Sequence, residues 1–310
     1  MSRSNQPTVE MQAALDMLTA EFGELGDGTL MPISEGRAQS ARTHAFWNRT
    51  MPEVAMVEPI ELGVGEPGTL FVPHNDEGRG AILYIHGGGW AFCSAATHEG
   101  VARSLAVAAG APVATFDYRL APEHPFPAGL DDCRTAWAAF RRGMDRPALG
   151  VAGDSAGANL SLATLLADGP AEPAAIALLF YGVFGTDFET PSARTHAEAP
   201  GLTTDKMRRF FDWYVPADRH RDPLVAPVLA SDAALTALPP LFINAAGIDP
   251  LRSDSEMLHA RLAALGRADE FVIHEGVIHG FMLMGAVLEE ARVAMQRAGD
   301  AFKRAAKTTA

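Results

Sequence analysis

The residue whose setting best indicates chemistry is Ser155, in the segment GDSAG at 153–157. An apolar run at 148–152 precedes this segment, and a helical pattern at 156–167 follows it. A serine on so tight a strand-to-helix turn takes a strained backbone conformation, and the flanking glycines let strand and helix approach. The turn lifts the hydroxyl clear of the sheet, beside a helix N-terminus that favours negative charge. The segment therefore predicts a nucleophilic serine.

A second motif, HGGGW at 86–90, follows the apolar run at 82–85. Backbone amides that carry no Cβ atom can turn toward the oxyanion of a tetrahedral intermediate. We assign this donor role to the amides of Gly87 and Gly88, together with that of Ala156 after the serine.

Three other residues within these motifs are interpreted as supporting ones: His86, Gly89 and Asp154. His86 precedes the nucleophile and is expected to fix the shape of the glycine loop through a hydrogen bond. Asp154 cannot share the direction of Ser155 on so sharp a turn. A buried polar network under the loop is expected from four further residues, Asp117, Tyr118, Arg119 and Glu123, and the alternative for them is a surface turn.

A serine nucleophile needs a base, and where the serine stands on such a strand-to-helix turn the three residues follow one another in the order Ser, Asp/Glu, His. His279 follows the strand-like run at 270–275 in a loop, and Gly280 gives it backbone freedom. His274 lies within that strand and His259 lies in mid-helix, so neither can reach over the sheet edge. His279 is therefore predicted to be the base.

The carboxylate that orients the base is predicted to be Asp249, which follows the strand-like run at 240–246. Asp before Pro250 is also a good helix N-cap, so a purely structural role is the alternative. Asp254 is the nearest rival, but it lies one turn further into the following helix.

These motifs, in this order, resemble the bacterial hormone-sensitive-lipase-like carboxylesterases of the α/β-hydrolase fold. The matching segments run from about residue 80 to the C-terminus: HGGGW at 86–90, TH at 97–98, DYRLAPEHPFPA at 117–128, the serine turn, DPL at 249–251 and HGF at 279–281. The resemblance implies a serine carboxylesterase that hydrolyses short- to medium-chain acyl esters through an acyl-enzyme. Cys93 departs from the pattern, because relatives usually carry glycine there; the departure concerns the local loop shape and the pocket size.

The elements that must position these residues are strands alternating with helices. Strand-like runs occupy 54–62, 68–73, 81–85, 112–117, 148–152, 175–181, 240–246 and 270–275, and helical patterns separate the later ones. Such alternation predicts a mostly parallel sheet covered on both faces. We expect an α/β-hydrolase fold with an eight-stranded, mostly parallel sheet flanked by helices and a helical cap.

The cap is predicted from two segments outside this alternation. About sixty residues separate the sixth and seventh strands, more than a crossover needs, and 204–215 has aromatic residues at helical spacing. Residues 8–22 form a second amphipathic pattern. We predict cap segments at 1–45 and 186–225 and a catalytic core at 46–185 and 226–310. The alternative for the insertion at 186–225 is a surface segment that packs only against itself and does not cover the site.

Composition limits the partners. The 310 residues carry a formal net charge of −13, which argues against nucleic acid and anionic membranes. No apolar run approaches the ~20 residues of a membrane span, so we expect a cytoplasmic protein.

The cysteines, Cys93 and Cys133, are expected to be reduced and packed. No metal-ligand spacing or phosphate loop is present, so no cofactor or metal is expected. The expected partner is a small-molecule ester, and a homodimer is compatible with the sequence.

Two other functions remain open. An amidase or peptidase could use the same three residues, because an amine leaving group needs the same acid. A non-catalytic small-ligand receptor could keep the pocket but lose the base. Since Ser155, Asp249 and His279 are all present, the sequence favours the enzyme.

Overall fold

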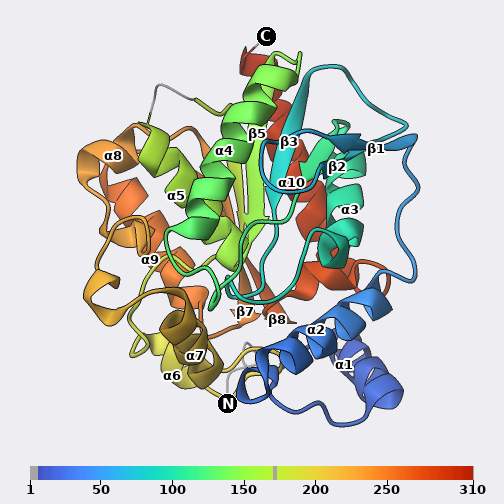
Figure 1. The fold of residues 1–310 in the computed structure, drawn as a ribbon, viewed down its shortest axis with the longest axis vertical. Helices are drawn as coiled ribbons and strands as arrows, with labels where there is room; N and C mark the ends of the chain where they lie inside the picture. The colour runs from blue at the N-terminus through green and yellow to red at the C-terminus, as the bar shows by residue number, and fades with distance from the viewer. Residues whose placement is uncertain (1–5, 170–172, 310) are drawn as a thin grey trace.

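One eight-stranded sheet organises the computed structural model, which describes residues 6–169 and 173–309 (Figure 1). The strand order is β1-β2-β4-β3-β5-β6-β7-β8. β2 runs antiparallel to both of its neighbours, and the strands from β4 to β8 run parallel. The strands are β1 Met56–Ile60, β2 Gly68–Val72, β3 Gly80–Ile85, β4 Val113–Thr115, β5 Ala148–Asp154, β6 Ile176–Phe180, β7 Leu241–Ile248 and β8 Glu270–Ile278. The predicted eight-stranded, mostly parallel sheet is confirmed.

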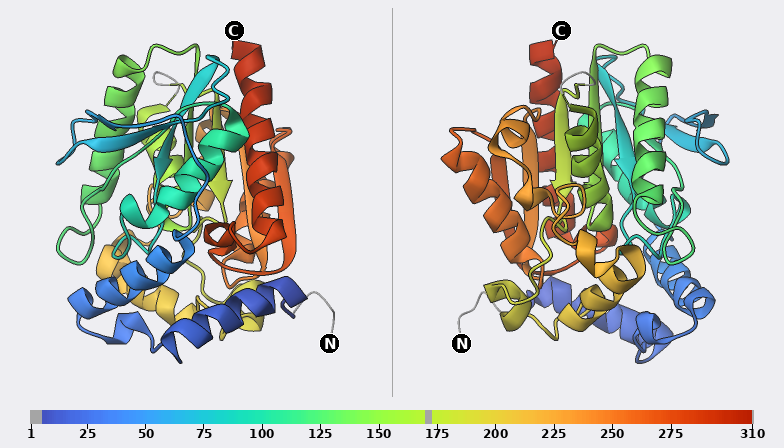
Figure 2. Two further views of the ribbon diagram at one scale, coloured as in Figure 1. Left: turned by 90° about the vertical axis from the view of Figure 1, so that its right-hand side faces the viewer. Right: turned by 60° about the vertical axis from the view of Figure 1, so that its left-hand side comes forward.

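Helices cover both faces of the sheet (Figure 2). Every residue of β3, β6 and β7 is buried, as expected for parallel strands that have apolar layers on each side. α3 Glu99–Ala109 and α10 Glu289–Thr309 form one core with the sheet. α4 Ala128–Gly143, α5 Ala156–Asp168 and α9 Arg252–Ala264 form a second core on the other face.

The segments predicted as a cap lie together at one end of the sheet (Figure 2). The N-terminal segment folds as α1 Val9–Phe22, the 3-10 turn η2 Gly28–Leu30 and α2 Ile33–Trp47. The later insertion folds as α6 Pro191–Thr195, α7 Thr204–Tyr214 and η5 Ala217–Arg219. The remaining short elements are η3 Ala96–His98, η6 Pro227–Leu229, α8 Asp232–Thr236 and η7 Phe281–Met284. The division into core and cap by residue number stays a prediction.

α2 is the longest of the helices that the sequence pattern does not indicate. Its sequence is mostly polar and has Gly36 in its interior, which lowers helix propensity. The packing requires that glycine, because a Cβ on Gly36 would lie 2.3 Å from the carbonyl oxygen of Gly28. Tertiary contact with η2 therefore determines this helix more than its own pattern does.

Within the described ranges, no helix combines the length and the apolar character that crossing a membrane requires.

Candidate active site

Ser155 stands on the tight turn between β5 and α5, with φ 53° and ψ −121°. The left-handed φ is strained for a residue with a Cβ. Its glycine neighbours make the turn feasible: a Cβ on Gly153 would lie 2.4 Å from the Gly157 carbonyl oxygen, and one on Gly157 would lie 2.0 Å from that of Ile85. The serine is 6% exposed. The strand–turn–helix geometry predicted for this segment is present.

Two further side chains join Ser155 in a chain of hydrogen bonds. His279, directly after β8, places Nε2 2.9 Å from Ser155 Oγ and Nδ1 2.7 Å from Asp249 Oδ2. A carboxylate only accepts, so Nδ1 carries the hydrogen and Nε2 is left to accept from the serine hydroxyl. The structure thus brings together Ser155, His279 and Asp249 from the ends of three strands.

Asp249 combines both of the roles considered for it. Its Oδ1 accepts a hydrogen bond from the amide of Leu251 at 2.8 Å, as a turn-capping carboxylate does, while Oδ2 faces His279. Asp254 points elsewhere, because its Oδ2 accepts from the amides of Phe184 and Gly185 at 2.9 and 2.8 Å. The local fold therefore leaves Asp249 as the carboxylate at the imidazole.

The assignment of Gly87 as an oxyanion donor is wrong. Its N–H donates to Asp154 Oδ1 at 2.9 Å, so it turns away from the serine. Gly88 and Gly89, by contrast, line the cavity that holds Ser155. Their amides have no hydrogen-bond acceptor among residues 6–169 and 173–309. The free loop amides are therefore those of Gly88 and Gly89, one residue later than predicted.

Asp154 holds the glycine loop from behind. Its buried carboxylate accepts from Tyr84 Oη at 2.7 Å and lies 3.4 Å from Nε2 of His98. Burial opposes ionisation, but the charge and hydrogen bond of His98 and the hydrogen bond of Tyr84 outweigh it and lower the pKa of Asp154 to about 2. A permanently charged carboxylate therefore fixes the Gly87 amide, and with it the direction of the next two.

His86 also shapes the loop from within it. Its Nδ1 lies 2.8 Å from the backbone carbonyl oxygen of Gly87. Burial, and then the charge of His98, lower the pKa of His86 to about 4, so its ring is neutral at pH 7. The phenol of Tyr118 donates to the carbonyl oxygen of His86 at 3.0 Å and stacks on the imidazole.

The polar network expected from 117–123 is only partly present. Tyr118 supports the loop, but Arg119 pairs with Asp132 at 2.7 Å and Glu123 pairs with Arg37 at 2.6 Å. Asp117 is 67% exposed, but its carboxylate accepts from the amide of Ala95 at 2.6 Å and lies 3.7 Å from Nε2 of His86. The sequence reasoning missed both pairings, since Arg37 is far away in the chain and Asp132 lies in a helix with many candidate partners.

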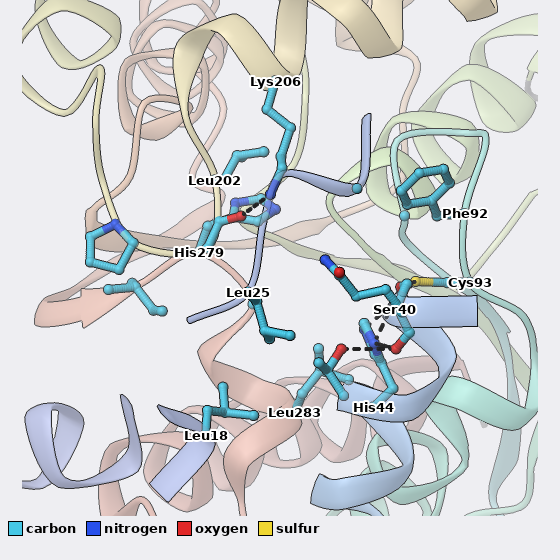
Figure 3. Close-up of a pocket in the computed structure, with 18 of the residues that line it drawn as sticks. Leu18, Leu25, Ser40, His44, Phe92, Cys93, Leu202, Lys206, His279 and Leu283 are labelled. Atoms are coloured by element: carbon cyan, nitrogen blue, oxygen red, sulfur yellow. Dashed lines mark hydrogen bonds between the residues drawn. The ribbon is translucent and has the colours of Figure 1, made fainter. Parts of the chain in front are cut away.

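The serine and histidine open into a cavity of about 530 Å³ under the cap. Figure 3 shows its walls: Leu18 lies on the side away from Lys206 and His279, and Ser40, His44 and Cys93 form one flank. Most of the lining surface is apolar, and α1, α2, α7 and η7 all contribute side chains to it. This is the volume of a small-molecule site. Among the described residues, no three His, Cys, Asp or Glu side chains are grouped to hold a metal ion.

The two parts of the cap are joined above this cavity. Arg209 of α7 donates to Thr29 Oγ1 at 2.7 Å and forms an ion pair with Asp27 beside it. Phe210 on the same helix lies against the glycine loop, where a Cβ on Gly89 would meet its ring at 2.4 Å. The cap therefore touches the residues that shape the site.

The parallel sheet, the strained serine after β5 and the histidine and aspartate after β8 and β7 are the features of an α/β-hydrolase. A family model described as alpha/beta hydrolase fold matches residues 82–283. The chain belongs to this family, within its hormone-sensitive-lipase-like carboxylesterases, so the resemblance seen in the sequence is confirmed.

Relatives with known activities agree with this membership. The carboxylesterase NlhH of Mycobacterium tuberculosis is 40% identical over 236 residues, covering 72% of this chain and 73% of the relative. An ethyl acetate hydrolase of Pseudomonas putida is 35% identical, covering 73% and 74%. The structure of a hyperthermophilic esterase from Pyrobaculum calidifontis superposes with a TM-score of 0.87 at 30% identity, covering 98% and 100%. The chain is a carboxylic ester hydrolase.

Proposed function

We propose that the chain hydrolyses short- to medium-chain acyl esters through an acyl-enzyme on Ser155. The observation that carries the proposal is the unbroken line of hydrogen bonds from Asp249 through His279 to Ser155, at the floor of a mostly apolar cavity. A cytoplasmic location and a homodimer stay predictions.

In this mechanism Ser155 Oγ attacks the ester carbonyl carbon while His279 Nε2 takes the hydroxyl proton. Asp249 holds Nδ1–H and stabilises the imidazolium. The amides of Gly88, Gly89 and Ala156 donate to the oxyanion. His279 then returns the proton to the leaving alcohol, the C–O bond breaks, and a water activated by the same imidazole releases the acid.

The cavity supports the substrate class. Its volume of about 530 Å³ and its cap of helices suit an acyl group of limited length, and closing the site around it excludes water from the reacting atoms. The name of the Pseudomonas putida relative, ethyl acetate hydrolase, supports a small ester as well.

The test combines covalent labelling with mutation. An organophosphonate ester should inactivate the enzyme stoichiometrically and label Ser155, as peptide mass mapping would show. Ser155→Ala should abolish the label, and Ser155→Ala and His279→Ala should each lower kcat for a p-nitrophenyl ester by ~10³-fold or more. Label on another residue, or full activity in either variant, would refute the assignment.

A parallel assay separates the remaining candidates. Turnover of p-nitrophenyl butyrate without turnover of the matching anilide is expected of an esterase. Comparable rates on the anilide would indicate an amidase instead. Tight binding of the ester without turnover would indicate a receptor.

A further inference from the structure

The cavity contains a second nucleophile and base that the proposed esterase mechanism does not use. Cys93, three residues beyond the HGGGW motif, places Sγ 3.6 Å from Nε2 of His44 and 3.3 Å from Oγ of Ser40. All three residues line the cavity that holds Ser155, and all are half-buried rather than sealed in the core (Figure 3). A small molecule that enters the cavity therefore meets this sulfur.

The hydrogen bonds around His44 fix its tautomer. Nδ1 lies 2.7 Å from the backbone carbonyl oxygen of Ser40, one turn earlier in α2. A carbonyl only accepts, so Nδ1 carries the hydrogen and Nε2 presents its lone pair to Cys93. The Ser40 hydroxyl can donate to the sulfur once the thiol proton has left. The arrangement is that of a nucleophile, a base and an orienting acceptor.

The surrounding charges favour the ionised pair. The charge of His98 of η3 lowers the pKa of Cys93, and the charge of Asp154 of β5 raises that of His44. The other titratable groups near the pair, the phenols of Tyr84 and Tyr118, have raised pKa values and are uncharged. Asp154 pairs with His98, whose Nε2 lies 3.4 Å from its carboxylate. Nε2 of His44 therefore has Cys93 as its partner.

The pKa values of the pair shift accordingly. Burial would raise the pKa of Cys93, but the charge and hydrogen bond of His44 outweigh it and bring that pKa to about 7. The same partnership, acting against burial, raises the pKa of His44 to about 9. Between these values the pair is a thiolate beside an imidazolium.

We propose that Cys93, with His44 as its base, is a covalent modification site for small α,β-unsaturated carbonyl compounds that enter the ester cavity. The thiol proton passes to His44 Nε2, and the sulfur lone pair forms a bond to the β-carbon. The π electrons of the double bond move toward the carbonyl, and His44 returns the proton to the α-carbon. S–H has then added across C=C, with no leaving group and no oxidant. The adduct occupies the cavity and blocks hydrolysis.

Cys133 provides an internal control. It is fully buried in α4, and burial, followed by the charge of Asp132, raises its pKa well above the ordinary thiol value. It should remain unmodified in the folded protein while Cys93 reacts.

The experiment measures labelling of the full chain by acrylamide, an α,β-unsaturated amide, with mass mapping of each cysteine and parallel assay of ester hydrolysis. Labelling of Cys93 should rise with pH through a midpoint near 7, and hydrolysis should fall in step. Cys93→Ser should be resistant to inactivation. Because the primary readout is labelling of a cysteine, its failure would leave the proposed function on Ser155 untouched.

His44→Gln tests the base by a change in the pH profile. Without His44 the burial of the thiol is no longer offset, so the variant pKa should be at least the ordinary value of about 8.5, and its labelling at pH 6 should be at least about fivefold slower than that of the wild type. At pH 9.5 it should be roughly fourfold faster, since a thiolate of higher pKa is the better nucleophile. The two profiles therefore cross, which a loss of packing alone would not produce.

Three results would overturn the proposal: no label on Cys93 in the folded wild type, a wild-type midpoint above pH 8, or parallel profiles for the wild type and His44→Gln. If His44→Gln does not fold, the wild-type midpoint alone decides.

Discussion

At the scale of single residues, the geometry of the site depends on which polar atoms are already used in other hydrogen bonds. Asp249 uses one oxygen for the Leu251 amide and so presents the other to His279. Gly87 gives its amide to Asp154 and so leaves the oxyanion role to its neighbours. These hydrogen bonds determine which way the remaining polar atoms point, and residue type alone does not.

Asp249→Asn should lower kcat by roughly 10³- to 10⁴-fold, because an amide nitrogen facing Nδ1 favours the wrong imidazole tautomer. Asp254→Asn is the matched control: Asp254 lies five residues later, its carboxylate bonds backbone amides of the loop after β6, and activity should change less than threefold. Steady-state kinetics on one p-nitrophenyl ester would measure both. A severe Asp254→Asn effect beside a mild Asp249→Asn effect would reverse the assignment.

Asp254 should also make stability depend on pH. Burial is the main cause that raises its pKa, to about 7, whereas an unfolded Asp titrates near 3.9. Between those values the folded state keeps a proton that the unfolded state has lost, so this group's contribution to stability falls as pH rises. Below the unfolded pKa the contribution is complete.

The uncharged Asp254→Asn variant should lack this loss. Its free energy of unfolding relative to wild type should therefore increase by about 3 kcal/mol between pH 4.5 and pH 8, the part of the linkage that falls in this window for a shift of about three units. Urea denaturation at the two pH values would measure the difference. A relative stability that stays constant or declines toward pH 8 would show that the carboxyl is ionised throughout.

At the scale of elements, the segments predicted to form the cap come from two separate parts of the chain and contact each other. Arg209 of α7 joins them by reaching Asp27 and Thr29 before and within η2. Its neighbour Arg208 pairs at 2.9 Å with Glu189, inside the same insertion, and does not bridge to the N-terminal segment. The two arginines therefore differ in whether they cross the cap.

Arg209→Ala should loosen the N-terminal segment, while Arg208→Ala should not. We expect KM to rise roughly fivefold for Arg209→Ala, equivalent to about 1 kcal/mol for a partly exposed ion pair with its hydrogen bond. Limited proteolysis should cut residues 10–50 faster in that variant. Equal proteolysis of the two variants would mean that apolar packing alone holds the cap.

At the scale of the whole molecule, the sequence predicts what repeats locally and misses what distant contacts decide. The alternation of strands and helices predicts all eight strands, and chain order places the three strand-end residues that meet at the serine. α2 is missed because its packing on η2, and not its pattern, makes it helical. The role of Gly87 is misassigned because its partner, Asp154, lies 67 residues later. His44 is missed for the same reason, since nothing local links it to Cys93.

The assembly of the cavity from distant segments leads to a prediction about acyl length. Leu18 of α1 lines the cavity on the side away from His279 (Figure 3), whereas Met17 beside it is 42% exposed and lies outside the cavity lining. kcat/KM should peak at short acyl chains for the wild type and fall for long ones, because the cap limits depth. Leu18→Trp should fill that end and cut kcat/KM for octanoate at least tenfold more than for acetate, whereas Met17→Trp should leave the profile unchanged. A series of p-nitrophenyl esters that differ only in acyl length measures this. If Leu18→Trp lowers kcat/KM equally for esters of every acyl length, the acyl group lies on another side of the cavity. The N-terminal segment then does not limit the length of the acyl chain.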